Sequence, residues 1–156
     1  MSRDERFRAE ALALGYSFEG EIRIGGHYSP LVRDGDTLHV SGQIPRVGDE
    51  VVVTGAAGEA VDLDRARLAA KICVLRALAL IQRSLGSLDQ VRRIPGMSVF
   101  VQSARHFTQQ SEVADAASGV LFNVLGEAGE HARTSVGVYQ LPKNATVEVS
   151  LIASVA

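Results

Sequence analysis

The stretch from Asp64 to Leu85 limits the possible folds more than any other part of the chain. It places apolar residues on two helical stripes, and Gly86 follows as a stop signal. The stripes consist of Leu68, Ile72, Leu75 and Ala79 and of Val74, Leu78, Ile81 and Leu85. A helix with so broad an apolar surface has to be covered by another layer of structure. We therefore expect this helix to lie on a β-sheet.

The charged residues inside this helix are all basic, and we interpret them as its solvated face. They are Arg65, Arg67, Lys71, Arg76 and Arg83. The alternative is an RNA-binding groove, which the sequence disfavours because no aromatic side chains are interleaved with them to stack bases. The only cysteine, Cys73, lies in the same apolar run, so we expect a buried and unreactive thiol.

Two further helices are predicted on either side of this segment. Residues from Ser2 to Leu14 form a short N-terminal helix, with Ser2 as its cap and Gly15 as its stop. A second helix runs from about Ser111 to Leu125, with Ser111 as its cap.

Short alternating stretches separated by turns predict antiparallel strands at Glu21–Ile24, Thr37–Gly42 and Glu50–Thr54. Further strands are predicted at Met97–Val101, Ser135–Gln140 and Ala145–Ser154. The element order α, several β, α, β, α, β, β predicts an α+β fold. No linker or repeat divides the chain, so we expect one domain over residues 1–156, with residues 1–17 as a helical extension.

Composition narrows the classes of function. The 156 residues are 46% apolar and 22% charged, which is typical of one globular domain with its own core. The net charge of −2 provides no general field for a phosphate backbone, which disfavours nucleic acid as a partner. Met1 to Glu10 lacks the apolar region of a secretory signal, and no run approaches the ~18 apolar residues of a membrane span. We expect a cytoplasmic protein without a membrane partner.

Common catalytic and ligand motifs are absent from the sequence. Gly25-Gly26 neither opens a helix nor precedes the Lys-Ser/Thr of a phosphate-binding loop. Ser41-Gly42 lacks the flanking glycines of a nucleophile elbow. The four histidines show no metal-ligand spacing, and no second cysteine is present. We expect no metal site.

Arg133 is the strongest candidate for a binding residue. It comes directly before a predicted strand, where a guanidinium can offer two parallel hydrogen bonds to a carboxylate. The alternative is a surface arginine paired with an acidic neighbour, and the residues alone favour that alternative. Glu148 alternates with Val147 and Val149, so it faces away from them. It is either an exposed strand charge or, beside a cleft, a group that could activate water.

Three stretches of the sequence resemble the YjgF/Rid family of reactive-intermediate (enamine/imine) deaminases. The first joins Gly26-His27-Tyr28-Ser29-Pro30 to Val40-Ser41-Gly42-Gln43-Ile44-Pro45. The second comprises Gly86-Ser87-Leu88-Asp89-Gln90-Val91 and Val99-Phe100-Val101. The third, and most specific, comprises Ala132-Arg133-Thr134-Ser135-Val136-Gly137-Val138, Leu141-Pro142 and Val147-Glu148-Val149.

This resemblance implies a mostly antiparallel sheet backed by two helices, the chorismate-mutase-like YjgF fold, and a homotrimer with clefts between subunits. It implies that Arg133 holds the carboxylate of a small metabolite and that Glu148 places or activates a water. Tyr28 would line the cleft from a neighbouring subunit, with Ser41 and Gly42 in its wall. The resemblance also implies that neither a metal nor an organic cofactor takes part.

The chain departs from the best-known deaminases at Ser135, which stands where they have a cysteine. The stretch from Ser111 to His131 is also longer, which is similar to a longer branch of the family. The leading hypothesis is an imine or enamine deaminase that releases ammonia from 2-imino acids. The alternatives are a non-catalytic protein that binds 2-keto acids and, less favoured, an endoribonuclease.

Overall fold

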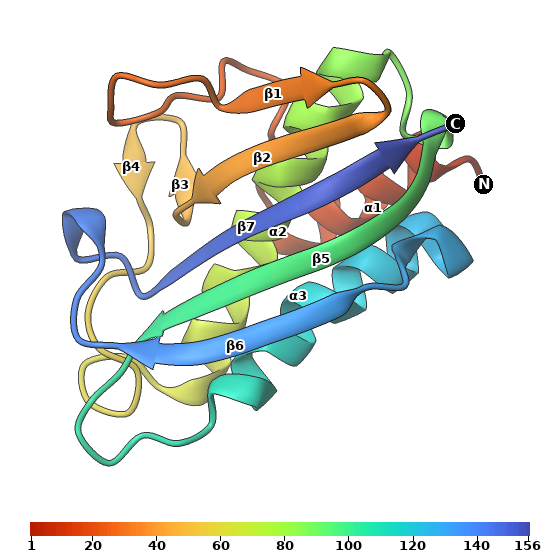
Figure 1. Ribbon diagram of the computed structural model, residues 1–156. Helices are drawn as coiled ribbons and strands as arrows, with labels where there is room; N and C mark the ends of the chain where they lie inside the picture. The colour runs from red at the N-terminus through yellow and green to blue at the C-terminus, as the bar shows by residue number, and fades with distance from the viewer.

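A five-stranded sheet organises the protein, with its strands in the order β1-β2-β7-β5-β6 (Figure 1). The computed structural model describes residues 1–156. The strands are β1 (Leu31–Asp34), β2 (Thr37–Gln43), β5 (Val91–Gln102), β6 (Ala132–Val138) and β7 (Val147–Val155). All neighbouring pairs are antiparallel except β5 and β6. A separate hairpin joins β3 (Arg46–Val47) to β4 (Glu50–Val51). The predicted α+β fold with a mostly antiparallel sheet is confirmed.

Helices cover one face of this sheet and leave the other face open (Figure 1). The helices are α1 (Arg3–Leu14), α2 (Leu63–Leu85) and α3 (Gln110–Leu125). Short 3-10 turns follow three elements: η1 (Leu88–Gln90), η2 (Gly126–Gly129) and η3 (Pro142–Asn144). None of the helices combines the length and the apolar character that crossing a membrane requires.

The ends of α1 and α2 follow from the residues that flank them. Ser2 accepts a hydrogen bond from the backbone N–H of Glu5, whose carboxylate accepts one from the Ser2 N–H, so α1 begins with a capping box. Asp62 caps α2 in the same way, by accepting from the N–H of Arg65 at 2.8 Å. Gly15 and Gly86 end the two helices in the left-handed conformation.

The core lies between the sheet and helices α2 and α3, and the apolar stripes of α2 are buried as the sequence predicts except at Leu68 and Leu85, which are partly buried. Along β7, Val147, Val149 and Leu151 face the helices and are almost fully buried, whereas Glu148 between them is only partly buried. Cys73 is buried and contacts the carbonyl oxygen of Val147, which confirms the expected structural thiol. Burial raises the pKa of this thiol well above its usual value, so it stays protonated.

Four local predictions are wrong. Residues Glu21–Ile24 form no strand, and the first strand is β1 instead. The strand β5 extends through Pro95, because this proline sits where the register with β7 shifts and no ladder bond is needed. Ser111 does not cap α3, whose N-cap position is Gln109 and has no side-chain cap. Arg133 lies within β6 rather than directly before it.

Candidate functional site

A pocket of about 180 Å³ opens beside the start of β7. It is lined by four basic residues, one acidic residue and a small set of neutral ones. The basic residues are Arg23, Arg46, Arg76 and Lys143, and the acidic residue is Glu148. Gly25, Tyr28, Gly42, Gln43 and Pro142 contribute to the rest of the wall, with Ile24 and Ile44. The pocket is therefore polar and carries an excess of positive charge.

Glu148 is the only acidic side chain in this pocket. Its position in β7 follows from the alternation that turns Val147 and Val149 toward the helices. No basic side chain lies within ion-pair distance of its carboxylate, because the three ion pairs of the structure involve other residues. Desolvation by burial raises the pKa of Glu148, which makes its carboxylate a stronger base.

Gly42 allows this carboxylate to approach the backbone of β2. A Cβ atom at position 42 would lie 2.5 Å from Oε2 of Glu148 and 2.8 Å from its Cδ. Glu148 could not keep its position beside any residue with a side chain at this point. The family resemblance implies Ser41 and Gly42 in the cleft wall; Gly42 lines this pocket, whereas the Ser41 hydroxyl donates to the carbonyl oxygen of Ser29.

Arg76 forms the floor of the pocket from α2. Only 3% of the residue is exposed, so the prediction that it belongs to a solvated helix face is wrong. Its guanidinium donates to Oε1 of Gln43 and to two carbonyl oxygens, those of Arg46 and Arg23. No carboxylate pairs with it. Burial lowers its pKa to about 10, so the group remains charged at neutral pH.

The other three basic residues differ in how far their charges are already neutralised. Arg23 pairs with Asp49 at 3.0 Å and lies 3.7 Å from Glu21. Arg46 has no ion pair, and its Nε is the only buried side-chain nitrogen or oxygen without a hydrogen-bond partner. Lys143 also lacks a carboxylate partner, and it occupies a left-handed backbone conformation with φ 60° in η3. The positive charge of the pocket therefore resides mainly on Arg46, Arg76 and Lys143.

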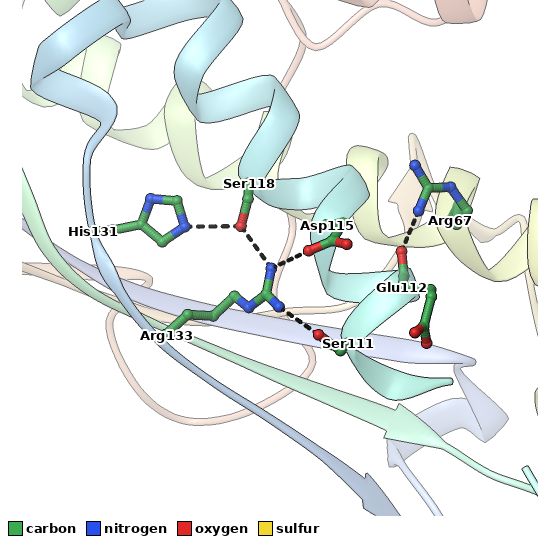
Figure 2. A network of polar contacts seen from close by, with 7 residues as sticks. All are labelled: Arg67, Ser111, Glu112, Asp115, Ser118, His131 and Arg133. Atoms are coloured by element: carbon green, nitrogen blue, oxygen red, sulfur yellow. Dashed lines mark hydrogen bonds and ion pairs between the residues drawn. The ribbon is translucent and has the colours of Figure 1, made fainter. Parts of the chain in front are cut away.

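Arg133 lies elsewhere, in a polar network between β6 and α3 (Figure 2). Its Nη1 donates to Oδ1 of Asp115 at 2.8 Å and to Oγ of Ser118 at 3.0 Å. Its Nη2 donates to Oγ of Ser111 at 2.9 Å. Of the five N–H donors of an arginine, the one on Nε and one on Nη2 remain without a partner. These two can still bind a carboxylate.

His131 extends this network through a contact with Ser118 (Figure 2). Its Nδ1 lies 2.6 Å from the carbonyl oxygen of Gly129, which can only accept, so Nδ1 carries the proton of the neutral ring. Its Nε2 then accepts from Oγ of Ser118 at 2.8 Å. With the ring in this tautomer, Ser118 donates a hydrogen bond to His131 and accepts one from Arg133, which holds the guanidinium in one orientation.

Arg133 and Glu148 lie on opposite faces of the sheet. Arg133 is level with Met97 and Leu151, which face the helices, whereas Glu148 is level with Phe100 and points to the other face. Three residues along the strands and two strand spacings across separate their Cα atoms by about 14 Å. One copy of the chain therefore does not bring the predicted carboxylate-binding group and the predicted base together.

The remaining predicted residues divide between these two places. Tyr28 lines the pocket of Glu148 within one copy, away from Arg133. Ser135 lies on β6, two residues after Arg133, and shares its orientation toward the helices. Sequence reasoning missed Arg46 and Lys143 as pocket residues. The Leu141-Pro142-Lys143-Asn144 turn was recognisable, but nothing in the sequence shows that it faces Glu148.

Comparisons with known proteins place the chain in one family. A family model described as Endoribonuclease L-PSP matches residues 19–155. Among curated proteins, the chain is similar to Protein TCP17 of Trypanosoma cruzi, with 38% identity over 148 residues. That alignment covers 94% of this chain and 92% of the relative.

Solved structures show the same architecture. The protein Atu1372 of Agrobacterium tumefaciens is 34% identical, with a TM-score of 0.88, and the match covers 99% of this chain and 95% of that one. The YjgF gene product of E. coli is 23% identical, with a TM-score of 0.63 and coverage of 89% and 95%. The second likeness concerns the fold alone.

Proposed function

This chain belongs to the endoribonuclease L-PSP (YjgF) family, and from that premise we propose that it is a deaminase that hydrolyses imines or enamines of small carboxylate-bearing metabolites. The observation that carries the proposal is Glu148. It is an unpaired, partly buried carboxylate with a raised pKa, and it lies in a cationic pocket beside Gly42 and Tyr28. A general base with these properties suits the addition of water to an electrophilic carbon.

Glu148 carries the protons in the proposed reaction. Its carboxylate takes a proton from water as the water oxygen bonds to the imine carbon, and it returns that proton to the imine nitrogen. The product is a tetrahedral carbinolamine. Glu148 then moves the hydroxyl proton to the amine, the C–N bond breaks, and ammonia and a 2-keto acid leave. Imine and water are thereby converted to ketone and ammonia, and the base is regenerated.

Arg133 holds the substrate carboxylate in this proposal, and it comes from a second copy of the chain. Its two free N–H donors match the two oxygens of a carboxylate, while Asp115, Ser111 and Ser118 fix its orientation. Because Arg133 and Glu148 are on opposite faces within one copy, only an assembly can place both at one substrate. We propose the homotrimer as that assembly, with Ser135 beside Arg133.

Subunit mixing tests this arrangement directly. Arg133→Ala and Glu148→Gln are each expected to be inactive on freshly generated 2-aminoacrylate. Co-refolding equal amounts of both restores about a quarter of the sites, because half of the copies supply an intact Arg133 and half supply an intact Glu148. A mixture that stays inactive contradicts a site shared between copies.

Light scattering and calorimetry decide the remaining alternatives. A monomeric mass for the active protein would refute the trimer. Binding of pyruvate without any acceleration of imine loss would refute the deaminase and leave a metabolite-binding protein.

A further inference from the structure

We propose that the pocket beside Glu148 binds a second anionic group of the substrate, so that the enzyme prefers dianionic metabolites over simple 2-imino monocarboxylates. The groups that hold it are Arg46, Arg76 and Lys143. This inference rests on the proposed function for the position of the first carboxylate, at Arg133 of a second copy. The second group is a carboxylate or a phosphate, which share the same negative oxygens.

The first argument is the unbalanced charge of the pocket. Four basic side chains line it against one carboxylate, and only Arg23 among the four has acidic partners of its own. Glu148 does not neutralise the other three, since it forms no ion pair with any of them. Three cations gathered around a concave pocket of about 180 Å³ attract an anion, because their fields add in the space between them.

The second argument is the burial of Arg76. Proteins rarely bury a guanidinium without a carboxylate, because removing the charge from water is unfavourable unless an opposite charge offsets it. Arg76 is 97% buried, and its three hydrogen-bond acceptors are all neutral. An anion in the pocket would supply the missing negative charge and would also give the buried Nε of Arg46 an acceptor.

The third argument is the backbone of η3. Lys143 and Asn144 both adopt left-handed conformations, with φ 60° and 58°. Asparagine accepts this region readily, whereas lysine does so at a cost. The side-chain oxygen of Asn144 accepts from Nε2 of Gln102 at 2.9 Å, which holds the turn in place. A strained residue fixed by its surroundings is a common feature of ligand sites, and here the strained residue turns a cation toward the pocket.

Binding of stable substrate analogues by calorimetry tests the pocket without requiring turnover. Pyruvate carries one carboxylate, 2-oxoglutarate carries two, and phosphoenolpyruvate carries a carboxylate and a phosphate. We expect both dianions to bind at least tenfold more tightly than pyruvate, the effect of about one charge-assisted hydrogen bond. The dianion that binds more tightly identifies whether the second group is carboxylate or phosphate. Equal affinity for all three overturns the proposal.

Two variants locate the effect. Arg46→Gln removes an unpaired cation, and Lys143→Asn removes another while keeping a residue that tolerates the left-handed turn. Each should weaken dianion binding about tenfold and leave pyruvate binding within twofold. Arg8→Gln on the exposed face of α1 is the matched control, and it should change neither. Unchanged dianion affinity in both pocket variants overturns the proposal.

Turnover separates this inference from the proposed function. Imines generated from alanine and from glutamate are compared by kcat/KM. Hydrolysis of both at equal kcat/KM refutes the dianion preference and leaves the deaminase intact. Selective binding of the dianions with no hydrolysis of either imine refutes the deaminase and leaves the anion pocket intact.

Discussion

Replacing Gly42 by alanine perturbs the proposed base without touching the core. The added Cβ atom would lie 2.5 Å from Oε2 of Glu148, so the carboxylate has to retreat by about 1 Å to reach an ordinary contact distance. The end of a glutamate side chain can make this movement at little cost. Gly42 also has no positive φ, so alanine fits the backbone, and the loss of chain entropy in the unfolded state stabilises the fold by about 0.4–1 kcal/mol.

Activity responds in the opposite direction. A displacement of about 1 Å in a catalytic group reduces the rate by about a hundredfold, so we expect kcat/KM for 2-aminoacrylate to fall by that factor. The melting temperature should be unchanged or slightly higher. Gly20→Ala is the matched control, because a Cβ atom there meets nothing within 4 Å and Gly20 has no positive φ either. It should leave kcat/KM unchanged, with the same unchanged or slightly higher melting temperature.

The double variant Gly42→Ala/Glu148→Gln makes the test stricter. If alanine acts only by displacing Glu148, the double variant is no less active than Glu148→Gln alone, because residues that act together are not additive. Full activity in Gly42→Ala, or a loss of activity that follows a loss of stability, would refute the reasoning.

Three further changes test other parts of the structure. Burial raises the pKa of Glu148, so the folded protein favours the protonated carboxyl and loses stability as the pH rises through the raised pKa. Glu148→Gln should therefore raise the melting temperature at pH 7 but not below pH 4, as measured by calorimetry. Gly129→Ala would drive a Cβ atom against the backbone carbonyl of Leu121, and urea unfolding should show a loss of at least about 2 kcal/mol. Asp115→Asn loosens Arg133 in a partly exposed network, so KM should rise about fivefold with kcat retained; a change in kcat alone would contradict this.

Sequence patterns were sufficient for the elements whose burial is periodic. The two stripes of α2, the capping residues Ser2 and Gly15 and the alternation around Glu148 are local signals, and the structure contains all of them. Glu21–Ile24 shows the limit, because an alternating stretch becomes a strand only when a neighbouring strand pairs with it.

The residues of the pocket were harder to predict because their environment is tertiary. Arg76 has the sequence context of an exposed helical charge, yet the irregular segment carrying Arg23 and the hairpin carrying Arg46 cover it. The acceptors that tolerate its burial are backbone carbonyls, which every residue type provides. No pattern of side chains in the sequence can therefore distinguish a buried Arg76 from an exposed one.

The separation of Arg133 from Glu148 follows from the same alternation that builds the core. The register of β5 with β6 and β7 puts Met97 and Leu151 on the buried face, and Arg133 shares that face. Moving Arg133 to the face of Glu148 would require a slip of β6 by one residue, which would turn all side chains of that strand to the opposite face of the sheet. The sheet thus cannot assemble both groups within one copy. If water addition needs both, the chemistry has to be a property of the assembly, while the cationic pocket beside Glu148 is already complete in each copy.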